Sequence, residues 1–364
     1  MSIDVARART ETPGCANVVH LNHAGASLMP ASVADAVVDW VREEEMTGGY
    51  ETARRRQDHL ENFYDATASL LNCRRDEVAF IENATRAWDM AFYALDLGPG
   101  DRILTAECEY GSNMIAYLHR AKRHGCEVAI VPSDKHGQLD VSALESMIDA
   151  HTKLISISHV PTGGGLVNPA EAVGAVARKH AIPYLLDACQ SVGQMPIDVE
   201  AIGCDFLSAT GRKYLRGPRG TGLLYCRRRW IAELDIDPPL LDIHAAELVS
   251  ETEYVMRPDA RRFENWGMLL RRESGARHRD RLRSRVGPGR DPGASRHAGL
   301  RRELAAVPEV TVTDRGIHRC GIVTFVKDGE TPQAVRASLH YMTTEEEIER
   351  FVSVLRAAAP TTRW

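Results

Sequence analysis

The stretch that decides the fold spans residues 187–225, DACQSVGQMPIDVEAIGCDFLSATGRKYLRGPRGTGLLY. The apolar run IPYLLDA at 182–188 is typical of a buried strand, and it ends in the carboxylate of Asp187. A second apolar run, CDFLSAT at 204–210, leads into a glycine-containing turn that carries Lys213. Parallel strands of one sheet end at a shared edge, so the pattern predicts that this carboxylate and this lysine converge on one crevice.

Outward from this stretch, apolar runs of strand length alternate with helical patterns. Strands are predicted at 77–81, 101–107, 126–132, 152–160, 182–188, 204–210 and 220–227. Helices are predicted at 87–97, 112–124, 141–150 and 169–180, and before them at 31–72 with a break at Gly48-Gly49. Strands that alternate with helices of this length indicate an α/β fold with a mostly parallel, helix-covered sheet.

The remainder of the chain is less regular. Residues 228–255 are expected to form loops and short helices. An arginine-rich stretch with Gly and Pro follows at 271–297, and we interpret it as a solvated linker because no aromatic residues interleave its charges. A helix at 299–307, two strands and a closing helix capped by Thr343 or Thr344 then predict a small α+β unit.

Composition excludes several classes of partner. The chain has 364 residues, with 45 Lys+Arg against 50 Asp+Glu and a formal net charge of −5. This mild charge gives no reason to expect nucleic acid or a membrane surface as partner. No apolar run is long enough for a transmembrane helix, and the N-terminus lacks the apolar segment of a signal peptide. We therefore expect a cytoplasmic location.

The eight cysteines are scattered and include no CxxC pair. This spacing favours reduced structural thiols over a disulfide framework or a zinc site, so no metal is expected.

A carboxylate and a lysine at one crevice are what a pyridoxal-phosphate (PLP) site requires. The lysine amine binds the cofactor aldehyde, and a carboxylate beside the pyridine nitrogen keeps that nitrogen protonated. Hydroxyls and backbone N–H groups at a helix start hold the phosphate. A lone Asp at a strand end is usually a cap, and a lone Lys in a glycine-rich turn is usually solvent-exposed. Only the joint pattern of Asp187 and Lys213 favours the cofactor site.

This joint pattern resembles the signature of the class V aminotransferase and cysteine desulfurase group, D-x-A-Q-S/A-x-G followed by S-G-H-K-x-x-G-P-x-G. The resemblance implies the aspartate aminotransferase-like fold of PLP-dependent transferases, fold type I, and PLP as cofactor. It implies Lys213 as the Schiff-base lysine and Asp187 as the pyridinium partner. It further implies that Gln190 bonds the cofactor phenolate oxygen and that Thr210 bonds the phosphate. Arg212 replaces the usual histidine, and a cation there still suits a phosphate.

Other segments resemble the same family. FIENATRAW at 80–88 implies that Ala84 and Thr85 begin a helix under the phosphate. ECEYGSNMIAY at 107–117 places Tyr110 where a histidine normally stacks on the cofactor ring. Thr221 matches a position that in this family reaches the phosphate of the partner subunit, which implies a homodimer. On the substrate side, the resemblance implies His23, and Thr162 stands where many relatives carry Asn.

Arg336, in VRASLHYMTTEEE, is the candidate that would grip the substrate carboxylate through a bidentate pair. Two alternatives remain at this point. VRASL could instead be the helix that relatives place directly after the strand GIVTFV, and Arg336 could be an exposed helical arginine.

The resemblance divides the chain into an N-terminal arm at 1–20, a large PLP-binding domain at 21–260 and a small C-terminal domain at 261–364. This chain departs from the family in the small domain. The stretch 271–297 replaces an amphipathic helix, and about thirty residues that include the active-site loop and the desulfurase cysteine are missing before the R-A-S segment. We therefore expect a poorly packed small domain.

The leading hypothesis is a PLP-dependent lyase or aminotransferase that acts on a small amino-acid substrate. Cβ elimination with C–S cleavage fits the desulfurase-like and isopenicillin-N-epimerase-like branches, although transamination and epimerisation use the same ring chemistry. The absence of a later cysteine disfavours a persulfide-forming desulfurase. The alternative is a PLP-binding protein whose catalysis is lost or reduced because the small domain is truncated.

Overall fold

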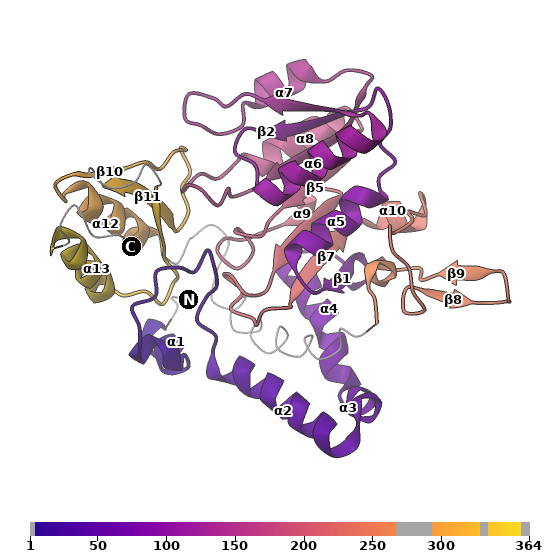
Figure 1. The fold of residues 1–364 in the computed structure, drawn as a ribbon, viewed down its shortest axis with the longest axis horizontal. Helices are drawn as coiled ribbons and strands as arrows, with labels where there is room; N and C mark the ends of the chain where they lie inside the picture. Colours follow the sequence, from indigo (N-terminus) through magenta and orange to yellow (C-terminus); the bar gives the residue numbers. More distant parts are fainter. Residues whose placement is uncertain (1–3, 267–292, 328–333, 358–364) are drawn as a thin grey trace.

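A seven-stranded sheet forms the centre of the computed structural model, which describes residues 4–266, 293–327 and 334–357 (Figure 1). Its strands are β1 (Val78–Ile81), β2 (Arg102–Ala106), β3 (Glu127–Val131), β4 (Thr152–Ser158), β5 (Tyr184–Asp187), β6 (Phe206–Thr210) and β7 (Gly222–Cys226). The order is β1-β7-β6-β5-β4-β2-β3, and only β7 runs antiparallel to its neighbours. This confirms the predicted mostly parallel sheet.

Alternate strand residues enter two separate cores. Phe80, Leu104 and Leu186 belong to one buried cluster, whereas their neighbours Ile81 and Leu185 belong to the other. Side chains of a strand point alternately to the two faces, so both faces of this sheet are covered. Helices α5 (Ala84–Ala94), α6 (Gly111–His124) and α10 (Arg228–Ala232) cover one face, and α4 (Gln57–Leu71), α7 (Val141–Met147), α8 (Ala170–Lys179) and α9 (Val199–Ile202) cover the other.

The long N-terminal helical region is broken where the sequence predicts. Helix α2 (Ala31–Thr47) ends at Gly48, whose φ of +90° suits glycine, and α3 (Gly49–Arg55) follows. A second break at Arg56 precedes α4. The remaining short helices are α1 (Val5–Thr10), η1 (Pro13–Ala16), η2 (Arg75–Glu77) and η3 (Ala260–Phe263).

The expectation of loops and short helices at 228–255 is wrong for its second half. Strands β8 (Ala246–Leu248) and β9 (Tyr254–Met256) form an antiparallel hairpin that extends away from the body in Figure 1. Each strand has only three residues, and their side chains are largely exposed. Such a hairpin lacks the alternation of buried and polar residues that identifies a strand from sequence.

The C-terminal residues form a three-stranded antiparallel sheet, β10 (Val310–Val312), β11 (Ile322–Lys327) and β12 (Val335–Ser338), with helices α12 (Ala294–Ala305) and α13 (Glu345–Ala357). Poor packing was the wrong expectation for this unit. Leu300, Val323 and Phe325 are fully buried in a common cluster with Leu339 and Val352.

The sequence predicts a cap at the start of α13 and a solvated linker at 271–297. Thr344 is confirmed as a cap of α13, since its backbone N–H donates to Glu347 Oε2 at 2.9 Å and its hydroxyl accepts the Glu347 N–H at 3.2 Å. Most of the predicted linker 271–297 lies outside the described residues, and its last residues begin α12.

Candidate active site

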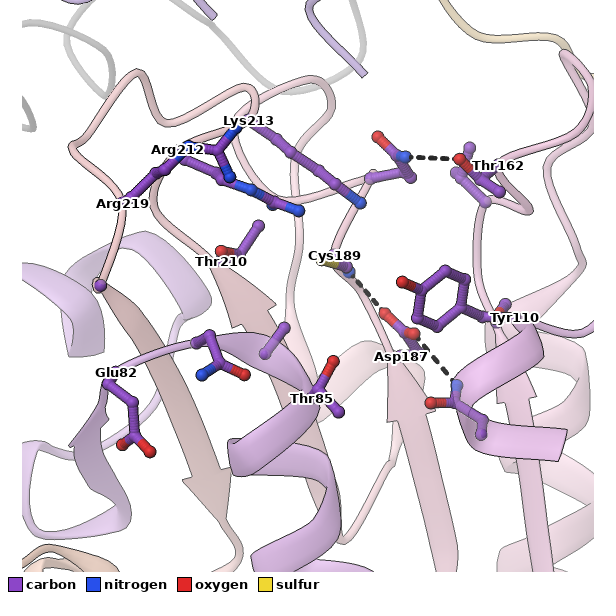
Figure 2. A pocket seen from close by; sticks show the side chains of 17 residues that line it. Glu82, Thr85, Tyr110, Thr162, Asp187, Cys189, Thr210, Arg212, Lys213 and Arg219 are labelled. Atoms are coloured by element: carbon purple, nitrogen blue, oxygen red, sulfur yellow. Dashed lines mark hydrogen bonds between the residues drawn. The ribbon is translucent and has the colours of Figure 1, made fainter. Parts of the chain in front are cut away.

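A cavity of about 410 Å³ opens where the parallel strands end (Figure 2). It brings together nine of the residues predicted from the sequence. These are Ala84, Thr85, Tyr110, Thr162, Asp187, Gln190, Thr210, Arg212 and Lys213. The site is thus assembled from the carboxyl edge of the sheet, where an open α/β sheet binds its ligand.

Lys213 lies in the turn after β6, and only 7% of it is exposed. The turn is closed by backbone bonds from Gly217 N to Gly211 O at 2.7 Å and from Arg216 N to Lys213 O at 2.9 Å. Gly193 packs under this turn with a φ of +86°, and a Cβ there would lie 2.8 Å from the backbone carbon of Tyr214. Close backbone contact therefore fixes the position of the lysine.

Asp187 ends β5 with its side chain in the same cavity (Figure 2). Its Oδ1 accepts the backbone N–H of Cys189 at 2.9 Å, and its Oδ2 accepts the Asn113 side-chain amide at 3.1 Å. Burial raises the pKa of Asp187, and these hydrogen bonds and the charge of Lys213 oppose that rise. A protonated nitrogen beside this carboxylate, such as that of a pyridinium ring, would stabilise its ionised form.

The opposite end of the cavity suits a phosphate. Helix α5 begins there, with Ala84 and Thr85 in its first turn and Asn83 accepting the N–H of Arg86 at 2.9 Å. The positive end of the helix dipole and the guanidinium groups of Arg212 and Arg219 line the same end. Arg219 was not anticipated from the sequence, although it belongs to the same glycine-rich turn as Lys213.

Gln190 and Thr162 form the wall beside Lys213. The Gln190 amide nitrogen donates to Thr162 Oγ1 at 3.0 Å and to the Ala24 carbonyl at 3.1 Å. Its Oε1 is buried and has no hydrogen-bond partner among the described residues, which costs about 1–3 kcal/mol. The expected bond to a phenolate oxygen needs an N–H donor, and both N–H groups of Gln190 already donate to Thr162 and Ala24, so that bond would require one of these contacts to be exchanged.

Arg336 reaches this wall from the C-terminal unit. Residues 335–338 form strand β12, so the alternative of a helix at this position is wrong. The Arg336 guanidinium donates to Thr162 Oγ1 at 2.6 Å and to Asn22 Oδ1 at 3.2 Å. Thr162 Oγ1 thereby accepts two N–H groups, which leaves its own hydroxyl hydrogen for a third partner.

Three predicted residues are not among those that line the cavity: Arg336, which is linked to it through Thr162, and His23 and Thr221. His23 is buried, with its Nδ1 3.0 Å from Ser27 Oγ and its ring 5.0 Å from that of His340. Thr221 is also buried, and its hydroxyl donates to the Pro218 carbonyl at 2.7 Å. Neither side chain is among those that line this cavity within the described chain.

Three residues near the ring end were missed by sequence reasoning: Glu109, Asn113 and Cys189. Asn113 and Cys189 line the cavity, and Glu109 lies directly behind it. Glu109 follows the end of β2, much as Asp187 ends β5, and this placement of an acid was the available signal. Burial raises the pKa of Glu109 to about 7.

The described residues contain no group of three or more His, Cys, Asp or Glu side chains that could hold a metal. Among the described helices, none is both long and apolar enough to cross a membrane. The residues present fit a PLP site, because a buried lysine, a buried carboxylate and a cationic end suited to a phosphate line one cavity.

Comparison with known proteins identifies the family. The probable cysteine desulfurase of Methanothermobacter thermautotrophicus is 30% identical over 259 residues, which cover 70% of this chain and 64% of that protein. The probable cysteine desulfurase of Pyrococcus abyssi is 26% identical over 387 aligned residues, 95% of this chain and 96% of that protein.

Solved structures share the fold. The cystine C–S lyase C-DES, in complex with its product cysteine persulfide, superposes with a TM-score of 0.85 at 23% identity, covering 95% of this chain and 99% of that chain. The apo cysteine desulfurase of Thermococcus onnurineus gives 0.83 at 24% identity, with 98% of each chain covered. The family model for class-V aminotransferases matches residues 19–266. The chain therefore belongs to the class-V aminotransferase family of PLP-dependent enzymes.

Proposed function

We propose that this chain is a PLP-dependent C–S lyase that cleaves the Cβ–S bond of a cysteine-type amino acid. The single observation that carries the proposal is the convergence of Lys213 and Asp187 in one cavity whose wall is linked to Arg336. The relatives named as cysteine desulfurases and the fold shared with a cystine C–S lyase support the reaction class.

One group of residues would bind the cofactor and a second group would bind the substrate. Lys213 would hold the cofactor, Asp187 would keep a proton on its ring nitrogen, and Arg212 with the start of α5 would bind its phosphate. Bound PLP supplies an electron sink that stabilises negative charge at the substrate Cα. The Arg336 guanidinium would bind the substrate carboxylate, and the Thr162 hydroxyl would donate to an anionic oxygen of the ligand.

Proton transfer at Cα falls to Lys213. When its Nζ is not bonded to the cofactor, the amine of Lys213 would accept the Cα proton as a general base. Loss of the sulfur from Cβ with the bonding electron pair then completes the elimination. For cysteine with one water the products are pyruvate, ammonia and sulfide, so atoms and charge balance.

The fate of the sulfur separates this proposal from a persulfide-forming desulfurase. Cys189 is the cysteine that lines the cavity among the described residues, whereas Cys320 is buried at 1% exposure outside it. Burial raises the pKa of Cys189 to about 11. A protonated thiol is a poor nucleophile, which favours direct release of the sulfur.

Products from a panel of cysteine, cystine, cysteine conjugates and simple amino acids test the reaction class. The proposal expects pyruvate, ammonia and a sulfur product from at least one sulfur-containing substrate. Alanine with a persulfide on Cys189 would instead identify a desulfurase, and a keto acid without ammonia release would identify a transaminase. An absorbance band of bound cofactor that no amino acid changes would support the alternative of a PLP-binding protein without turnover.

We also infer that the chain acts as a homodimer in the cytoplasm. The hairpin β8–β9 and the segment before it expose large apolar side chains: Leu240 at 49%, Ile243 at 72%, Leu248 at 66%, Val249 at 55% and Val255 at 58%. Exposed apolar surface of this kind favours a protein partner. The cysteines form no disulfide among the described residues, which supports a reducing compartment. Sedimentation analysis of the purified protein measures the oligomeric state, and a monomer at micromolar concentration would contradict the first inference.

A further inference from the structure

The Glu109 carboxylate has no part in the reaction outlined above, yet it accepts hydrogen bonds from four groups. Its Oε1 accepts the backbone N–H of Tyr110 at 2.6 Å, the Asn113 amide at 3.1 Å and the Ser158 hydroxyl. Its Oε2 accepts the Thr105 hydroxyl at 3.2 Å. One carboxylate thus connects the ends of β2 and β4 with the start of α6.

Three of these four donors line the cofactor cavity, while Glu109 itself does not. Tyr110 presents its ring to the cavity beside Asp187, as Figure 2 shows, and Asn113 and Ser158 also line the cavity. Glu109 can therefore act on a bound ligand only through these neighbours.

The Asn113 side chain links Glu109 to Asp187 by hydrogen bonds. Its amide nitrogen has two N–H groups, and it donates at 3.1 Å to Glu109 Oε1 and at 3.1 Å to Asp187 Oδ2. With one N–H held by Glu109, the other is directed at the Asp187 carboxylate. Asp187 is in turn fixed by the Cys189 backbone at its other oxygen.

We propose that Glu109 is a positioning residue for the cofactor ring. Glu109 would hold Tyr110 in position to stack on the cofactor ring. Through Asn113 it would orient the Asp187 carboxylate toward the nitrogen of that ring. The proposal rests on PLP binding in this cavity, which the proposed function shares, but not on which bond of the substrate is cleaved.

Cofactor binding without substrate tests this role. PLP is titrated into the cofactor-free protein, and the dissociation constant and the pH midpoint of the visible absorbance band are measured. Glu109→Ala is expected to weaken binding at least about tenfold, because three donors that line the cavity lose their common acceptor. It should also shift the midpoint, since the carboxylate facing the ring nitrogen is no longer held. A role in folding alone would leave that midpoint unchanged.

Matched variants keep the test decisive. Glu109→Gln retains an oxygen acceptor and is expected to restore most of the affinity. Glu107→Ala, two residues earlier and exposed, should leave both quantities as in the wild type. If Glu109→Ala does not fold, Asn113→Ala removes only the bridge and should shift the midpoint in the same direction.

A wild-type dissociation constant and midpoint in Glu109→Ala, or in Asn113→Ala where the former is unfolded, would overturn the proposal. This result is distinct from failure of the proposed lyase reaction, because no substrate is present in the titration.

Discussion

The two sides of the cavity are built in different ways. The cofactor side comes from the strand ends and turns of one sheet, with Asp187 and Lys213 only 26 positions apart in the sequence. The proposed substrate side joins Thr162, which lines the cavity, to Arg336 and through it to Asn22, and these residues come from three distant parts of the chain. The cofactor side can therefore form within the large sheet, whereas the substrate side requires the C-terminal unit to be docked in place.

This difference predicts which substitutions separate cofactor binding from substrate binding. A change on the cofactor side should alter the absorbance of the bound cofactor before any substrate is added. A change on the substrate side should leave that absorbance intact and appear only in the substrate dependence of the rate.

The largest effect is expected on the cofactor side. Lys213→Ala should lower kcat by on the order of 10²–10⁴-fold or more, because it removes both the covalent anchor and the general base. Steady-state kinetics measure the loss, and Lys179→Ala, which alters an exposed lysine on α8, is the matched control. Retention of more than a tenth of the wild-type rate would contradict the role assigned to Lys213.

Arg336→Ala tests the substrate side. Loss of a charge-assisted pair costs about 1.5–3 kcal/mol, so KM should rise by about 10- to 150-fold while the dissociation constant of PLP stays unchanged. Initial rates over a range of substrate concentrations measure KM. Arg302→Ala, on the exposed side of α12, is the control. A loss of PLP binding in Arg336→Ala would show that the two sides are not separable.

Thr162 lies where the two sides meet. Thr162→Val keeps the shape of the side chain but removes a hydroxyl that accepts from Gln190 and Arg336. We expect kcat/KM to fall about tenfold, close to the value of one hydrogen bond to a charged group. Thr162→Ser should restore most of that loss. If the Val variant and the wild type have equal kcat/KM values, the Thr162 hydroxyl has no role in substrate binding.

The last effect concerns folding stability, not catalysis, and lies at His159 behind the cofactor side. His159 is 8% exposed, its backbone N–H bonds to the Asp187 carbonyl at 2.9 Å, and burial lowers its pKa to about 4. The unfolded chain binds this proton near pH 6.5 and the folded chain only near pH 4, so folding stability decreases as pH falls across that range.

The resulting loss of folding free energy between pH 6.5 and pH 4 is on the order of 3 kcal/mol. His159→Leu should therefore flatten the loss of stability between pH 6.5 and pH 4, as chemical denaturation at several pH values would measure. His151→Ala, at an exposed histidine, should leave the slope unchanged. An unaltered slope in His159→Leu would mean that His159 is protonated in the folded protein within this range.

The centre of the cofactor side was predictable because Asp187 and Lys213 belong to short segments at the ends of β5 and β6, which are consecutive among the parallel strands and adjacent in the sheet. Asp187 lies at the end of an apolar strand and Lys213 follows one, and this local pattern is visible in the sequence without long-range contacts. Glu109 was missed because its partners Asn113, Ser158 and Thr105 lie on other elements, and only the folded chain brings their donors to one carboxylate.

The substrate side was less predictable for the same physical reason. The pairing of β12 with β11 turned the residues of VRASL into a strand, although their pattern also permitted a helix. The contact of Arg336 with Thr162 spans 174 positions, so no local pattern indicates it. The β8–β9 hairpin was missed because its exposed residues lack a buried face.

Attachment of the cofactor to Lys213 can be tested by chemical reduction of the link between them. The PLP-loaded protein is treated with borohydride, which fixes a cofactor–lysine link irreversibly, and its peptides are mapped by mass spectrometry. The cofactor mass is expected on the peptide that contains Lys213. Attachment to another lysine, or no attachment at all under conditions where PLP is bound, would contradict this expectation.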